Sequence, residues 1–114
     1  MRHFWKDSQN AEYHELHLDN RLPKVRMEYG RITRDVLSDK QPDADGMFLA
    51  NLIKDIPGLR EFRTEPSGYV LSVQRSLAVP AHEFKSSVAE GVMKFFLLSD
   101  GVQLEDDESI GGGE

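Results

Sequence analysis

The chain contains no cysteine among its 114 residues. It therefore forms no disulfide, and it cannot supply thiolate ligands for zinc or iron–sulfur centres or a cysteine nucleophile. It also lacks a long apolar run. The longest, over residues 92–98, is interrupted by Lys94 and falls far short of the about 20 residues that a membrane-spanning helix needs. The first residues lack the apolar stretch of a secretory signal. These absences predict a cytoplasmic protein without a membrane partner.

Basic residues are missing from the last fifteen positions, residues 100–114, which hold six acidic residues. The whole chain has a net charge of −6, and residues 1–99 carry equal numbers of acidic and basic side chains. The acidity therefore belongs to the tail. We expect residues 102–114 to be disordered, because they cannot bury enough apolar surface to order themselves. The tail is either a solubilising end or a competitor for a basic surface on the body.

Five segments alternate between apolar and polar side chains, as half-buried strands do. They are residues 13–18, 24–29, 32–37, 59–64 and 69–75. In the second segment, Val25, Met27 and Tyr29 are expected to face inward, and Gly30 then permits a turn or bulge. Because the links between strands are short, the sheet should be largely antiparallel.

Two segments carry apolar residues at helical spacing, residues 47–56 and the stretch that follows Pro80. Pro57 and Gly58 should stop the first helix. The predicted fold is α+β, with element order βββαββα, about five strands in a mostly antiparallel sheet, and two helices packed on one face. It divides into a polar N-terminal arm (1–10), a single domain (11–101) and the acidic tail (102–114).

Residues 47–96 resemble the N-terminal domain of Nfu/NifU-type iron–sulfur scaffold proteins. In that family, a helix that ends in Ile-x-Gly-Val leads to a hairpin and a C-terminal helix. The resemblance rests on Ile56, Gly58, Leu59, Val70, Val73 and the spacing of Phe84 and Val88. The family's early Pro-Asn-Pro-type segment is missing, and its cluster-holding Cys-x-x-Cys pair lies in a separate domain that this chain lacks. The resemblance implies a fold and an accessory or interaction role, without cluster binding.

Two polar groups suggest chemistry and have simpler explanations. His14 and His17 would share a face of a helix and could ligate zinc, but in a strand their odd spacing puts them on opposite faces. We expect a hydrated strand surface there, with no metal and no cofactor. His82 and Glu83 lie near Ser86 and Ser87, but no Gly-x-Ser-x-Gly elbow is present. A solvated first helical turn explains them, and we expect no enzyme.

The strongest local charge signal lies in residues 21–34, which hold five basic residues against Glu28. Lys24 and Arg26 are expected to point the same way from one strand. Arg31 and Arg34 would add to that face if the next strand pairs with this one in a hairpin. Such a face could bind phosphate or an acidic partner, or it could be a solvated sheet surface. The adjacent Phe4 and Trp5 should dock on the body or on a partner.

We therefore predict a small non-enzymatic interaction or scaffold-type module that binds another macromolecule, with a protein as the first partner class. The alternative is a weak nucleic-acid-binding protein that uses a basic strand face, with the acidic tail as competitor. The oligomeric state is left open. The predicted contact residues are Lys24, Arg26, Arg31, Arg34, Phe4 and Trp5.

Overall fold

A computed structural model of the chain describes residues 3–32 and 44–99. It has six strands and two helices in this part of the chain. In chain order they are β1 (His3–Asp7), β2 (Tyr13–Leu18), β3 (Arg26–Glu28), β4 (Arg31–Ile32), α1 (Ala44–Ile53), β5 (Leu59–Thr64), β6 (Val70–Arg75) and α2 (Ala81–Ser99). Neither helix is long and apolar enough to cross a lipid bilayer.

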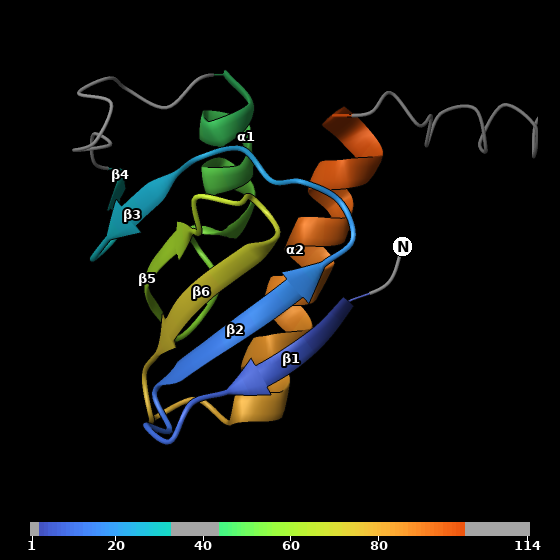
Figure 1. Ribbon diagram of the computed structural model, residues 1–114. Coiled ribbons are helices and arrows are strands. Elements are labelled where there is room, and N and C mark those ends of the chain that lie inside the picture. Colours follow the sequence, from blue (N-terminus) through green and yellow to red (C-terminus); the bar gives the residue numbers. More distant parts are fainter. Residues whose placement is uncertain (1–2, 33–43, 100–114) are drawn as a thin grey trace, which may run out of the picture.

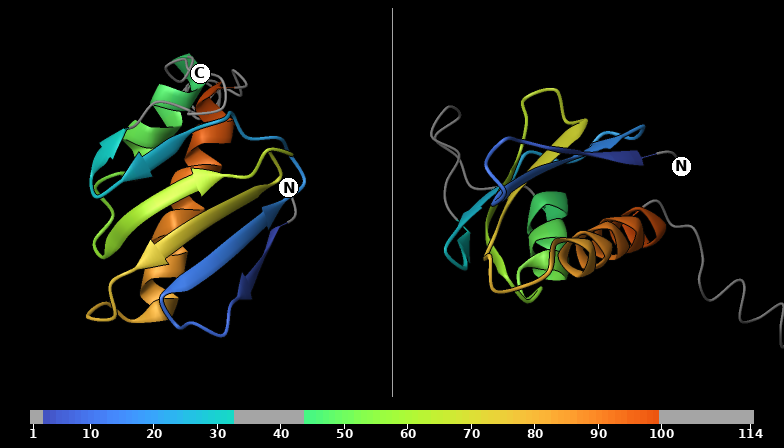
Figure 2. Two further views of the ribbon diagram at one scale, coloured as in Figure 1. Left: turned by 60° about the vertical axis from the view of Figure 1, so that its left-hand side comes forward. Right: turned by 90° about the horizontal axis from the view of Figure 1, so that it is seen from below.

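The strands form one sheet in the order β1-β2-β6-β5-β3-β4, and every neighbouring pair is antiparallel (Figure 1). Both helices lie on one face of this sheet, and no helix or strand of the described residues covers the opposite face (Figure 2). The predicted α+β class, antiparallel sheet and one-sided helical layer are confirmed. The uncovered face is called the open face below.

The core lies between the sheet and the helices, because inward strand positions and one face of each helix are apolar. Leu16 and Leu18 are buried as predicted, as are Val25 and Met27. Burying one large apolar side chain contributes about 1.5–3 kcal/mol, so the two layers hold each other mainly by this contact. The helices supply Leu49, Ala50, Ile53, Phe84, Val88, Val92, Phe95 and Phe96.

The expected N-terminal arm contains an edge strand, β1, which pairs with β2 so that Trp5 lies opposite Leu16. Trp5 packs against the core, whereas Phe4 lies on the open face, 58% exposed, and stacks on His17 with 4.6 Å between ring centroids. The prediction missed this strand because two adjacent aromatic residues break the alternation of apolar and polar positions. A strand places such neighbours on opposite faces, so each contacts a different surface.

The prediction that Tyr29 faces inward is wrong, because β3 ends one residue earlier. Tyr29 is 68% exposed with φ of 52°, and Gly30 has φ of 83°. Two positive φ values between Glu28 and Arg31 make the tight two-residue turn that joins β3 to β4. Gly30 has the predicted turn role. The rest of the predicted strand, residues 33–37, and the acidic tail lie outside the described residues.

Helix α1 begins and ends three residues before the predicted limits, and Gly58, with φ of 88°, supplies the turn into β5. Helix α2 begins directly after Pro80, as predicted. Gly91 lies where α2 approaches α1, since a Cβ atom there would be 2.7 Å from Cγ2 of Ile53. This glycine therefore sets the distance between the two helices.

Candidate functional site

The predicted basic residues Lys24 and Arg26 line two different hollows. Lys24 precedes β3 and lines a hollow of about 460 Å³ beside the last turn of α2, together with Arg21. Arg26 belongs to β3 and lines a different hollow, on the open face. Val25 and Met27, on either side of Arg26, are buried as the alternation predicted, and the shared basic face of Lys24 and Arg26 stays a prediction.

Carboxylates lie beside the predicted cations of β3 and β4, so these cations make a weaker basic surface than their number suggests. Arg26 forms an ion pair with Glu28 on the same strand. Arg31 is exposed on the short strand β4 and lies opposite Glu28 in the register. Arg34 lies outside the described residues. A carboxylate therefore lies beside the cations that β3 and β4 bring together.

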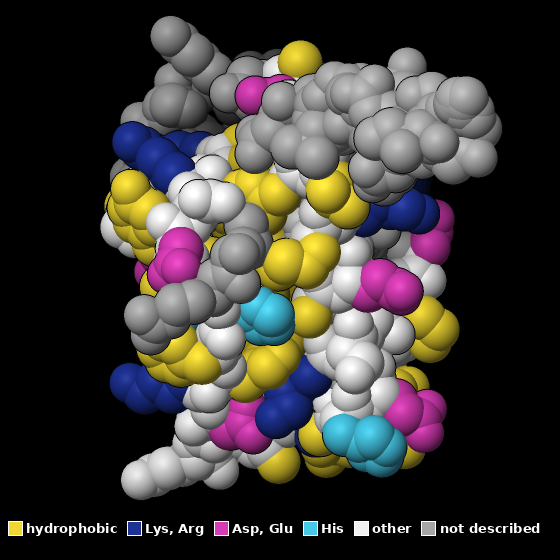
Figure 3. Space-filling view, turned by 90° about the vertical axis from the view of Figure 1, so that its right-hand side faces the viewer, with side chains coloured by type: hydrophobic (Ala, Val, Ile, Leu, Met, Phe, Trp, Pro, Cys, Tyr) yellow, Lys and Arg dark blue, Asp and Glu magenta, His cyan; other side chains and the backbone are white. Residues whose placement is uncertain are grey.

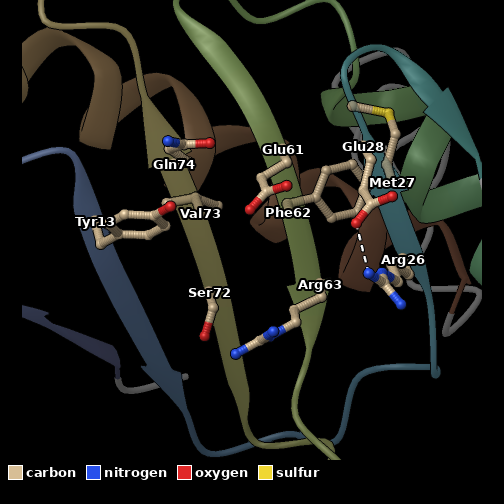
Figure 4. Close-up of a pocket in the computed structure, with 10 residues that line it drawn as sticks. All are labelled: Tyr13, Arg26, Met27, Glu28, Glu61, Phe62, Arg63, Ser72, Val73 and Gln74. Atoms are coloured by element: carbon tan, nitrogen blue, oxygen red, sulfur yellow. Dashed lines mark hydrogen bonds and ion pairs between the residues drawn. The ribbon is translucent and has the colours of Figure 1, made fainter.

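A hollow of about 300 Å³ lies on the open face, across β2, β6, β5 and β3. In Figure 4, Arg63 extends from β5 toward Ser72 on β6, while Glu28 reaches back to Arg26 on β3. Along β3 and β5 a cation and a carboxylate follow each other, while across the strands Arg26 lies opposite Arg63 and Glu28 opposite Glu61, so the face is polar and carries both signs of charge. The side chains around the hollow are Tyr13, Arg26, Glu28, Glu61, Arg63, Ser72 and Gln74.

Hydrogen bonds hold several of these side chains in place. The Ser72 hydroxyl donates to Oε2 of Glu65 at 2.8 Å, and the Gln74 amide donates to Oε1 of Glu12 at 3.0 Å. Nε of Arg63 lies 3.7 Å from Oε2 of Glu65. A face whose polar groups are already oriented loses less side-chain entropy when a partner binds.

A second polar cluster lies at the end of the sheet near the start of α2, with His14 and Arg75 buried and the Asp7 side chain 47% exposed at its rim. His14, 3% exposed, contacts Oδ1 of Asp7 through Nδ1 at 2.8 Å. Its other nitrogen, Nε2, accepts a hydrogen bond from Nε of Arg75 at 3.0 Å. Because an arginine Nε can only donate, Nε2 carries no proton and Nδ1 donates to Asp7. Both ring nitrogens are thus engaged.

Arg75 is 7% exposed and ties three segments together. It donates to the carbonyls of Ala11 at 2.8 Å and Val79 at 2.6 Å, besides His14. Lys85 on α2 completes the cluster, since its Nζ lies 3.1 Å from Oδ2 of Asp7 and 5.9 Å from the centroid of Trp5. The hydrogen bond from His14, followed by Lys85, holds the pKa of the Asp7 carboxyl below its ordinary value.

The prediction that His14 lies on a hydrated strand surface is wrong, because the residue is buried, and this cluster was not predicted from the sequence. The opposite-face prediction for His14 and His17 is confirmed, but the face of His14 is the one that packs on α2, where it contacts Phe84. A signal was present: Arg75 continues the inward series Leu71 and Val73. A cation at an inward position of a strand is buried, and it therefore needs several hydrogen-bond partners.

The described residues contain no group of three or more histidine, aspartate or glutamate side chains placed to hold a metal ion. His82 and Glu83 are exposed in the first turn of α2, as expected for a solvated turn. Searches against protein-family models, curated proteins and solved structures found no match. The resemblance to Nfu/NifU-type proteins stays a prediction.

Proposed function

We propose that the protein is a small non-enzymatic interaction module that binds a protein partner through the open face of its sheet. The observation that carries the proposal is the one-sided architecture. Both helices cover one face, while the other presents oriented polar side chains around a hollow of about 300 Å³. Tyr13 and Phe4, both exposed, border this surface and add apolar contact area.

The mixed charge of the open face favours a protein over a nucleic acid. Nucleic-acid affinity comes largely from cations that neutralise phosphates. On this face Arg26 is paired with Glu28, and Arg63 lies near Glu65, so carboxylates would meet the phosphates too. A protein surface offers both signs of charge and can match this arrangement.

The geometry of His14 supports a role without catalysis. A general base needs a nitrogen that can take a proton from a reacting group. Here Nε2 of the buried His14 ring accepts from Arg75, and Nδ1 donates to Asp7. We therefore assign this cluster to holding β1, β2, β6 and α2 together beneath the binding face.

The test is a charge reversal at the centre of the open face, Arg63→Glu, compared with Lys94→Glu on the exposed side of α2. Arg63 is 65% exposed, so neither change should unfold the protein. Immobilised parent and variants are incubated with nuclease-treated extract, and bound proteins are quantified by mass spectrometry. We expect a partner that the parent and Lys94→Glu retain and that Arg63→Glu loses about tenfold or more.

The proposal fails if Arg63→Glu retains the same proteins as the parent. It also fails if nuclease treatment removes all specific capture, because the partner would then be a nucleic acid. Circular dichroism of each variant checks that the fold is unchanged.

A further inference from the structure

Strand β1 forms one edge of the sheet, and no described strand pairs with its outer side. The pattern of hydrogen bonds fixes which backbone groups face outward. The amide of Ser8 donates to the carbonyl of Tyr13, so residues at even positions bond to β2. In an antiparallel pair the alternate residues point away from the partner strand. The N–H and C=O groups of His3, Trp5 and Asp7 therefore point outward.

We propose that this edge pairs with the same edge of a second copy of the chain, antiparallel and about a two-fold axis at Trp5. In that register the outward groups of the two strands meet, and the side chains match. His3 lies opposite Asp7 of the second copy, Phe4 lies opposite Lys6, and the two Trp5 rings are neighbours. Each strand supplies the group that the other needs, which is the condition for a two-fold contact.

Lys6 makes this pairing selective. A lysine on an edge strand normally deters association with other strands. In the proposed register its ammonium reaches the ring of Phe4, which is 58% exposed, and a cation over an aromatic face is favourable. Cross-strand pairs of opposite charge or of aromatic rings also stabilise an antiparallel contact. The strand is thus better matched to itself than to an unrelated strand.

The flank of α2 beside this edge extends the contact. Lys85 touches Asp7 and Trp5, and Ala89, Met93 and Leu97 follow it at four-residue spacing, which places them along one side of the helix. Figure 3 shows hydrophobic side chains between the edge strand and the helix on this side of the molecule. A second copy joined at β1 brings its own α2 flank near this surface and covers apolar area that the edge alone leaves exposed.

The contact is small, because β1 has five residues. Interfaces at the low end of the size range are weak and transient, so we expect a dissociation constant on the order of 10 µM or weaker. This inference does not depend on the proposed function, since the open face and the β1 edge are different surfaces.

Sedimentation velocity from about 1 to 500 µM, a range chosen to bracket a weak contact, measures the association. The chain has one tryptophan, so a 5-fluorotryptophan label gives a single fluorine resonance at the proposed axis. We expect a monomer–dimer equilibrium and a resonance that moves with concentration. His3→Asp sets two carboxylates opposite each other and should weaken the dimer about tenfold or more. The matched control His82→Asp, on the exposed start of α2, should dimerise like the parent.

The proposal is overturned by a monomer at every concentration, by a dimer whose tryptophan resonance stays fixed, or by a His3→Asp variant that dimerises like the parent. If the protein is a monomer and its tryptophan resonance moves when residues 100–114 are removed, the β1 edge binds that segment of the same chain and not a second copy. The Arg63→Glu variant should still dimerise, so failure of the open-face proposal and failure of this one are told apart.

Discussion

Replacing Arg75 by methionine should cost the protein a large part of its stability. The change keeps a long side chain but removes the donors of the hydrogen bonds to Nε2 of His14 and to the carbonyls of Ala11, Ser76 and Val79. A buried acceptor left without a partner costs about 1–3 kcal/mol. Ala11 is exposed and Ser76 and Val79 are half-buried, so water can replace the arginine in part at these carbonyls, and we expect a total loss of about 3–5 kcal/mol.

Such a loss is large for a domain of this size, whose free energy of unfolding is about 5–15 kcal/mol. It corresponds to a drop in Tm of roughly 15–30 °C. Urea unfolding followed by the fluorescence of Trp5 measures it. Arg63→Met is the matched control, because the same substitution at a side chain that is 65% exposed should change stability by no more than about 0.5 kcal/mol.

A double-mutant cycle with His14→Phe separates the shared hydrogen bond from the rest. Phenylalanine keeps an aromatic ring in the core and removes both nitrogens. Because each single change breaks the same Arg75–His14 bond, the two effects should be less than additive by at least about 1 kcal/mol. A loss below about 1 kcal/mol for Arg75→Met, or strict additivity in the cycle, would refute the view that this cluster holds the sheet to α2.

Two further predictions concern Asp7 and Gly91. The folded pKa of Asp7 lies below 3.8, so its carboxylate adds stability above that pH and the gain is lost as pH falls through the folded pKa. Near neutral pH the parent should be more stable than Asp7→Asn by no more than about 1 kcal/mol, and this difference should shrink in urea titrations as the pH falls below 3.8; a constant difference would contradict this. Gly91→Ala should destabilise the protein by about 1–3 kcal/mol, although alanine has the better helix propensity, because its Cβ would meet the buried side chain of Ile53. Thermal unfolding measures this change, and a variant more stable than the parent would show that the two helices can separate there.

Much of the fold could be predicted because periodicity records which face of a strand or helix is buried. The inward series Leu16, Leu18 and Val25, Met27 is visible in the sequence, and the structure buries all four. The sheet order could not be predicted in this way. β2 pairs with β6, so residues distant in the sequence, such as His14 and Val73, become neighbours. No local sequence pattern encodes which strand pairs with which.

The candidate site was less predictable for the same reason. Charge counts along residues 21–34 indicated a basic face, but the neutralising contacts depend on which carboxylates the fold brings near. The buried cluster depends on partners from β1, β2, β6 and α2, so its members look unrelated in the sequence. Arg75 alone could have been recognised, as a charged residue at an inward position of a strand.

The sheet order also bears on how the chain folds as it is synthesised. The hairpin of β1 and β2 emerges first, but its neighbour in the sheet, β6, begins only at Val70, after 51 intervening residues beyond Leu18. At about 5–20 residues per second, the ribosome needs roughly 3–10 seconds to deliver that strand. During this interval Leu16, Leu18 and Trp5 have no core to enter, so the nascent hairpin presents an apolar face that a chaperone can recognise.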